Sequence, residues 1–135
     1  MPSILCYGSC RSALIGLSQL GNRPIHTVEF YRAAIRQILQ DYGQHRPSHG
    51  EIDTEVIIDP ERDHYELLHV GWDGSRRVHG SVIHIDIIDG KIWIQHDGTA
   101  PGVAVELMEL GVPPEAIVLG IRPQNVRQYS GFAVA

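Results

Sequence analysis

The sequence predicts a single α+β domain, and three observations support that prediction. The chain has 135 residues, an ordinary length for one domain with one hydrophobic core. Apolar residues follow helical spacing near both ends of residues 28–135, and strand-like alternation fills the middle. We therefore expect an N-terminal helix, an antiparallel β-meander of three to five strands, a C-terminal helix and a short final strand.

Residues 1–27 differ in composition from the rest of the chain. They contain no acidic residue, and Arg11 and Arg23 are their only charged side chains. No basic segment precedes a continuous apolar run, so a signal peptide is not predicted. The stretch "SALIGLSQLGN" fits a short helix that ends at Gly21. We expect one domain over residues 28–135. Residues 1–27 are then a leader upstream of a true translation start at Val28, or a functional tail.

The segment "TVEFYRAAIRQILQDYG" predicts the first helix. Thr27 is a suitable N-cap, Glu29 interacts favourably with the positive end of the helix, and Gly43 is suited to ending it. The apolar positions follow helical spacing and comprise Tyr31, Ala34, Ile35, Ile38, Leu39 and Tyr42.

Three strands are expected next. "EIDTEVIID" alternates and is ended by Pro60, "HYELLHVGW" follows it, and "DGS" predicts a turn into "RRVHGSVIHIDII". Between the first two lies "ERDHY", whose paired charges fit a solvated turn. These segments predict the first part of the meander.

Asp89 and Gly90 form the strongest hairpin signal, because a two-residue turn requires positive φ and Asp-Gly adopts it readily. The implied register places Ile88 opposite Lys91 and His84 opposite Gln95. One face then carries five isoleucines, namely Ile83, Ile85, Ile87, Ile92 and Ile94. The other face carries His84, Asp86, Trp93 and Gln95.

The remaining segments predict a helix and a final strand. In "APGVAVELMELG", Pro101 suits a first helical turn, Val103 and Leu107 belong to an apolar stripe, and Gly111 can end the helix. "VPPEAIVLGI" predicts a further helical turn and a short buried strand.

Composition restricts the function. The net charge of -5 argues against broad, charge-driven DNA binding. No apolar run is long enough to cross a membrane. The cysteines, Cys6 and Cys10, cannot tie distant parts of the fold together, which favours a reducing, cytoplasmic setting. No membrane partner and no cofactor are expected.

Neither a metal centre nor a nucleophile is predicted. His84 and Asp86 share a strand face, but alternation puts His79 and His96 on the opposite face, and a tetrahedral site requires convergent ligands. Ser81 lies within a strand rather than on an exposed turn, so hydrolase chemistry has little support. A polar sheet face is the simpler interpretation, and no catalytic or metal-ligating residue is assigned.

Partner binding has better candidates, because Trp and Arg often anchor interfaces. If the helices cover the isoleucine face, a patch remains for a partner: Trp93, His84, Asp86 and Gln95. Arg76 and Arg77 follow a turn and are candidates for the same surface. Arg122 and Arg127 are candidate DNA contacts, with exposed salt bridges as the alternative.

Several segments resemble the XisI family of cyanobacterial proteins, the excision controlling factors of the fdxN element. They are "FYRAAIRQIL", "ERDHYELLHVGWDGSRRVHGSVIHIDIIDGKIWIQHDGT", "GVPPEAIVLGI" and the terminal "FAVA". The resemblance implies a non-catalytic accessory factor for programmed site-specific DNA excision during heterocyst differentiation. It also implies a XisH-like partner protein and a separate recombinase, and it assigns no catalytic residue.

Three hypotheses remain open. The first is an accessory factor that binds a XisH-like protein, with a homo-oligomer also open and DNA touched only indirectly or weakly. The second is a small metal-dependent hydrolase that uses His84, Asp86 and neighbouring residues. The third is a direct DNA-binding accessory protein that uses Arg76, Arg77, Arg122 and Arg127.

Overall fold

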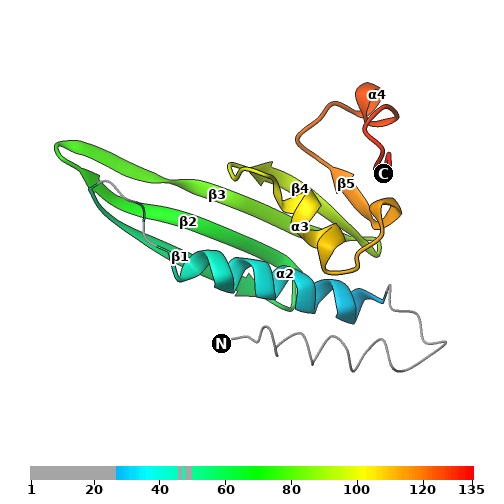
Figure 1. The fold of residues 1–135 in the computed structure, drawn as a ribbon, viewed down its shortest axis with the longest axis horizontal. Coiled ribbons are helices and arrows are strands. Elements are labelled where there is room, and N and C mark those ends of the chain that lie inside the picture. Colours follow the sequence, from blue (N-terminus) through cyan, green and yellow to red (C-terminus); the bar gives the residue numbers. More distant parts are fainter. Residues whose placement is uncertain (1–26, 46, 48–49) are drawn as a thin grey trace.

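The computed structural model describes residues 27–135 except residues 46, 48 and 49. The chain forms a five-stranded sheet with its two longest helices on one face (Figure 1). The elements are, in chain order, α2 (Val28–Gly43), β1 (Glu51–Asp59), β2 (His64–Asp73), β3 (Arg76–Ile88), β4 (Lys91–Asp97), α3 (Val103–Glu109), the 3-10 turn η1 (Pro114–Ala116), β5 (Ile117–Leu119) and α4 (Gln124–Arg127). This confirms the predicted α+β architecture.

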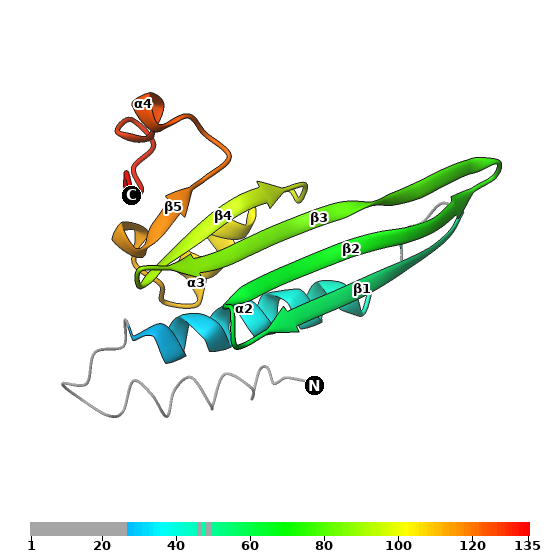
Figure 2. The same cartoon turned by 180° about the vertical axis from the view of Figure 1, so that it is seen from behind.

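The sheet order follows the chain from β1 to β5, and β1 and β5 are its two edges. The first four strands are antiparallel, while β5 runs parallel to β4. A parallel neighbour requires a crossover, which α3 and η1 provide. Seen from behind, the β2–β3 hairpin extends beyond the end of α2 (Figure 2). The hairpin tip is therefore not covered by a helix.

Helix α2 begins as the sequence predicts. The Thr27 hydroxyl accepts a hydrogen bond from the Phe30 amide at 3.2 Å, which satisfies one of the unpaired amides of the first turn. The helix ends at Gly43. Its apolar stripe, which includes Ile35 and Leu39, packs on the sheet and forms the core with buried strand residues. Among these strand residues are Tyr65, Leu67, Ile83, Ile85, Ile92 and Ile94. The helices thus cover the isoleucine face.

The predicted register of the β3–β4 hairpin is confirmed for its first four pairs, from Ile88 opposite Lys91 to Ile85 opposite Ile94. The fifth pair is wrong, because His84 lies opposite His96 rather than Gln95. A β-bulge at this point adds one residue to β4 and moves the next residue into register.

A second bulge lies between β2 and β3. Leu67 pairs with Ile83, but Leu68 pairs with Ser81, so Val82 is the extra residue of β3. The bulge shifts the alternation of every residue before Val82 by one position. This shift decides which histidines share a face in the site.

No helix in the described part of the chain is long and apolar enough to span a membrane. The predicted leader, its helix ending at Gly21 and the proposed start at Val28 concern residues 1–27, of which only Thr27 is described.

Candidate functional site

The sheet face turned away from α2 and α3, called the open face below, carries most of the predicted site residues. Paired residues in an antiparallel sheet point to the same side, so the register defines this face. His64 lies opposite Asp86 and Glu66 lies opposite His84, in two adjacent cross-strand pairs. Sheet pairing therefore brings two histidines and two carboxylates together.

These four side chains, called the His–carboxylate cluster, are joined by short contacts. His64 Nδ1 lies 2.9 Å from Asp86 Oδ1, and His64 Nε2 lies 2.8 Å from Glu66 Oε2. The His64 and His84 rings are 4.6 Å apart, centroid to centroid. All four side chains are 20–32% exposed, so the cluster is shielded but reachable from solvent.

The cluster changes the acid–base behaviour of His64. Burial lowers the pKa of His64, but the hydrogen bonds to Glu66 and Asp86 and their negative charges outweigh that effect and leave the pKa raised. His64 therefore holds a proton more strongly than an ordinary histidine does. Two carboxylates contact this one ring.

His84 is the poorly satisfied member of the cluster. Its Nε2 is buried and has no hydrogen-bond partner within the described part of the chain, although Asp86 Oδ2 lies 3.1 Å away. Asp86 Oδ2 instead accepts a 3.3 Å hydrogen bond from Gln95 Nε2. A buried ring nitrogen in this state is exceptional in folded proteins and requires an explanation.

The predicted separation of the histidines is wrong. His96 lies directly opposite His84 and so shares its face. His79 pairs with Val70, which is two alternations along β2 from Glu66, and it therefore also faces the open side. The two bulges produce both changes. Even so, the described His/Cys/Asp/Glu group suited to a metal ion comprises His64, Glu66 and His84 and includes neither of those histidines.

Asp97, the last residue of β4, has a structural role. Its Oδ2 accepts a 2.7 Å hydrogen bond from the Val103 amide, and its Oδ1 accepts bonds from the Thr99 amide and hydroxyl. Asp97 thus satisfies the first turn of α3, whose N-cap Gly102 has no capping side chain.

Trp93 is less available than the sequence indicates. The Arg127 guanidinium lies over its ring, 5.1 Å from the centroid, and a Cβ on Gly120 would approach Trp93 Cε3 to 3.2 Å. The segment after β5 therefore folds over this end of the open face. It is held there by the bridge between Val118 and Ala133.

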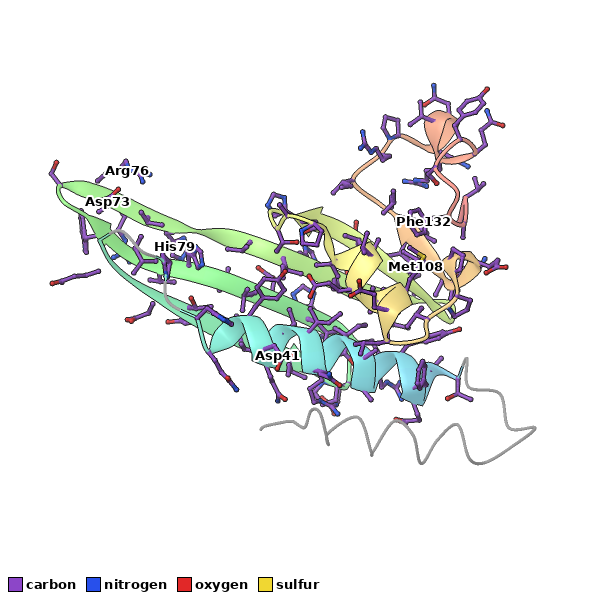
Figure 3. The ribbon with its side chains drawn as sticks, viewed as in Figure 1. Asp41, Asp73, Arg76, His79, Met108 and Phe132 are labelled. Carbon is purple, nitrogen blue, oxygen red and sulfur yellow. The ribbon has the colours of Figure 1, made fainter. Side chains whose placement is uncertain are left out.

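The predicted arginines divide into engaged and exposed ones. Besides stacking on Trp93, Arg127 donates hydrogen bonds to the carbonyls of Arg122 and Val134, at 3.0 and 3.2 Å. Arg122 is exposed. Arg76 and Arg77 are exposed at the hairpin tip, where Arg76 pairs with Asp73 at 3.2 Å (Figure 3).

Trp72 was not predicted as a site residue, yet it is 50% exposed beside those arginines. It pairs with Arg77 across the strands, and the Arg77 guanidinium lies 5.2 Å from its ring centroid. Trp72, Arg76 and Arg77 form what we call the tip patch.

Sequence reasoning also missed His64 and Glu66. Their spacing in "HYE" matches that of His84 and Asp86 in "HID", and both segments are strands. Pairing those two strands in the correct register would have brought the four residues together. The matching spacing is visible in the sequence, but it indicates a site only when the two strands are considered as a pair.

Comparison with known proteins identifies the family. The family model described as XisI protein matches residues 25–134. A crystal structure of a XisI-like protein from Anabaena variabilis is similar, with a TM-score of 0.73, 41% identity, and coverage of 78% of this chain and 96% of that one. No curated protein matches.

A second structure, described as fdxN element excision controlling factor XisI from Anabaena variabilis, gives a TM-score of 0.67 at 34% identity. It too is matched over 78% of this chain and 96% of its own length. The family match extends from α2 through the sheet to the C-terminal elements. The chain belongs to the XisI family.

Proposed function

We propose that this chain is a cytoplasmic, non-catalytic accessory factor that controls site-specific DNA excision by binding a XisH-like protein. Family membership supports the excision role, because a relative with 34% identity is described as an excision controlling factor. A factor that catalyses no reaction acts by binding, and in this proposal it binds a protein partner. The tip patch is the surface we assign to it.

The exposed Trp72–Arg77 pair is the observation on which this assignment rests. A half-exposed tryptophan leaves a large apolar surface in water, and tryptophan and arginine are the residue types most enriched at interface anchors. The pair stands beyond the end of α2 on an extended hairpin (Figure 2). A partner can therefore reach it without displacing a helix.

Charge favours a protein partner over DNA. The chain carries a net charge of -5, and DNA binding requires a concentrated positive surface. Arg127, one of the two predicted DNA contacts, already stacks on Trp93 and donates to backbone carbonyls. Its guanidinium is thus committed within the chain. The exposed arginines at the tip patch can pair with carboxylates on a protein.

The experiment is co-purification of the full chain with the XisH-like protein of its own host, both expressed together, followed by calorimetric titration. The tested variants are Trp72→Ala and the double variant Arg76→Ala/Arg77→Ala. Arg62→Ala is the matched control, because Arg62 is an exposed arginine of the β1–β2 turn, at the other end of β2.

We expect the wild-type chain and Arg62→Ala to bind equally, and the tip variants to bind at least tenfold more weakly. Each change removes an exposed side chain, so the fold measured by circular dichroism should be unaffected. Equal binding by all variants would remove the tip patch from the proposal. Failure of the wild-type chain to bind would refute partner control itself.

A further inference from the structure

We infer that His64, Glu66 and His84 form a binding site for one divalent transition-metal ion of the Zn²⁺ class, a site separate from the tip patch. One ligand atom from each residue can be chosen so that all three lie within 4.8 Å of one another. Ligands around a tetrahedral zinc ion are separated by about 3–4 Å, given bonds of about 2.0–2.2 Å. Small rotations of these side chains bring them into that range.

The donor set determines the class of metal. Two imidazole nitrogens and one carboxylate oxygen form a combination used by catalytic zinc sites, whereas calcium and magnesium prefer oxygen ligands alone. Three protein ligands leave one position of a tetrahedron open. Because the cluster side chains are partly exposed on the open face, water or a partner's side chain can fill that position.

Asp86 supplies the supporting contact that metal-bound histidines usually have. Its Oδ1 lies 2.9 Å from His64 Nδ1, while His64 Nε2 points to Glu66. Binding through one ring nitrogen while a carboxylate holds the other is the usual arrangement of a histidine on zinc. The hydrogen bond from Gln95 fixes the second oxygen of Asp86.

The state of His84 is the independent observation in favour of a ligand. Its buried Nε2 lacks a hydrogen-bond partner among the described residues, a state that usually costs stability. A cation bound in the His–carboxylate cluster would accept the lone pair of His84 Nε2. Antiparallel pairing across β2 and β3 fixes both histidines on one face, so the site is built on rigid strands rather than on a loop.

The test is titration of the purified full chain, first stripped with a chelator, with ZnCl₂ by calorimetry. Co²⁺ follows as a spectroscopic probe, since tetrahedral Co²⁺ absorbs intensely in the visible range. His64→Ala and His84→Ala remove ligands, and Glu66→Gln removes a charged ligand while keeping the shape of the side chain. Asp86→Asn weakens the supporting contact.

Three control variants exclude other donors. His79→Ala and His96→Ala each remove an open-face histidine outside the cluster, and Cys6→Ser/Cys10→Ser removes both thiols. Circular dichroism establishes whether each variant is folded. Glu66→Gln keeps the test decisive if a histidine variant does not fold.

We expect one Zn²⁺ per chain and a tetrahedral Co²⁺ spectrum. Asp86→Asn should weaken binding by about 10- to 100-fold, the usual effect of losing a supporting contact, and the ligand variants by more. Saturating Zn²⁺ should raise the Tm of the wild type and of all three controls, because a ligand bound to the folded state stabilises it. Absent binding, unchanged binding in Glu66→Gln, or loss of binding in the cysteine variant would overturn the inference.

Discussion

Arg32 and Asp63 form a two-pronged ion pair that ties helix α2 to the turn between β1 and β2. Arg32 Nε lies 2.7 Å from Asp63 Oδ1, and Arg32 Nη2 lies 3.0 Å from Oδ2. Asp63 also accepts a hydrogen bond from the Tyr65 hydroxyl, and its backbone carbonyl accepts one from the Ile87 amide. One residue thus links the helix, the turn and β3.

Asp63→Asn should destabilise the chain by about 1 kcal/mol at neutral pH, because a charged pair becomes a weaker neutral contact. Asparagine is the appropriate replacement, since Asp63 has a φ of 52° and asparagine tolerates that conformation. Denaturant unfolding measures the difference. Arg62→Ala, an exposed charge change nearby, should alter stability little.

The same pair predicts a pH dependence. The Arg32 hydrogen bond and charge lower the pKa of Asp63 below its usual 3.8, although burial opposes them. The folded state therefore binds this proton less readily than the unfolded state does. The stabilisation is fully present above the unfolded pKa and is lost as pH falls through the folded pKa. Wild type and Asp63→Asn should converge in stability in acid, and a constant difference down to the lowest pH would contradict the pair's role.

The pH dependence of stability that Glu106 contributes should have the opposite sign to that of Asp63. Burial raises the pKa of Glu106, the Tyr42 hydrogen bond opposes this, and the charges of Glu109, Asp97 and Asp41 add to it. The folded state binds the Glu106 proton more tightly than the unfolded state does. The ionised carboxylate therefore lowers the stability of the fold as pH rises above the unfolded pKa. Glu106→Gln should increase stability at pH 7 by less than about 1 kcal/mol, because the amide oxygen can still accept from the Tyr42 hydroxyl. Thermal unfolding at pH 7 checks it, with Glu61→Gln, an exposed carboxylate in the turn between β1 and β2, as the control.

Asp97→Ala should cost about 1–2 kcal/mol, since it removes the acceptor of the Val103 amide in the first turn of α3. Its neighbour His96 is exposed, so His96→Ala should be nearly neutral. Urea unfolding of the two variants gives the comparison. Equal stabilities would show that α3 does not depend on this side chain.

Trp93→Ala should destabilise the chain by about 2 kcal/mol, because it removes an aromatic side chain that packs beneath the C-terminal segment and the cation–π contact with Arg127. Hydrogen exchange should become faster in residues 117–135. Trp72→Ala, at the exposed tip, should leave that exchange unchanged. Equal protection of residues 117–135 in both variants would show that Trp93 does not anchor the segment.

Local sequence patterns predicted the helices and strands, whereas the positions of the site residues depend on how distant strands pair. The Asp89–Gly90 turn fixed four cross-strand pairs correctly, because a two-residue hairpin has a defined register. The bulges at Val82 and after Ile94 left no sequence signal, since an extra residue in a strand resembles ordinary alternation. They placed His79 and His96 on the open face, contrary to prediction.

The candidate site was only half predicted for a related reason. His84 and Asp86 were found because they share one strand, whereas His64 and Glu66 belong to a strand whose partner and register were unspecified. Likewise, no local pattern revealed that Arg127 would stack on Trp93 from thirty-four residues away along the chain. Such contacts depend on where the final segment folds.

Strand β1 forms one edge of the sheet, and its outer backbone groups have no neighbouring strand among the described residues. Such an edge can template the addition of another chain and lead to aggregation. Here acids occupy alternate positions of β1, at Glu51, Asp53 and Glu55, and all three are exposed. A second copy pairing with β1 would bring like charges together, which disfavours pairing. The alternating acids therefore disfavour edge-to-edge pairing of one copy with another through β1. Copies of this protein that associate should do so through another surface.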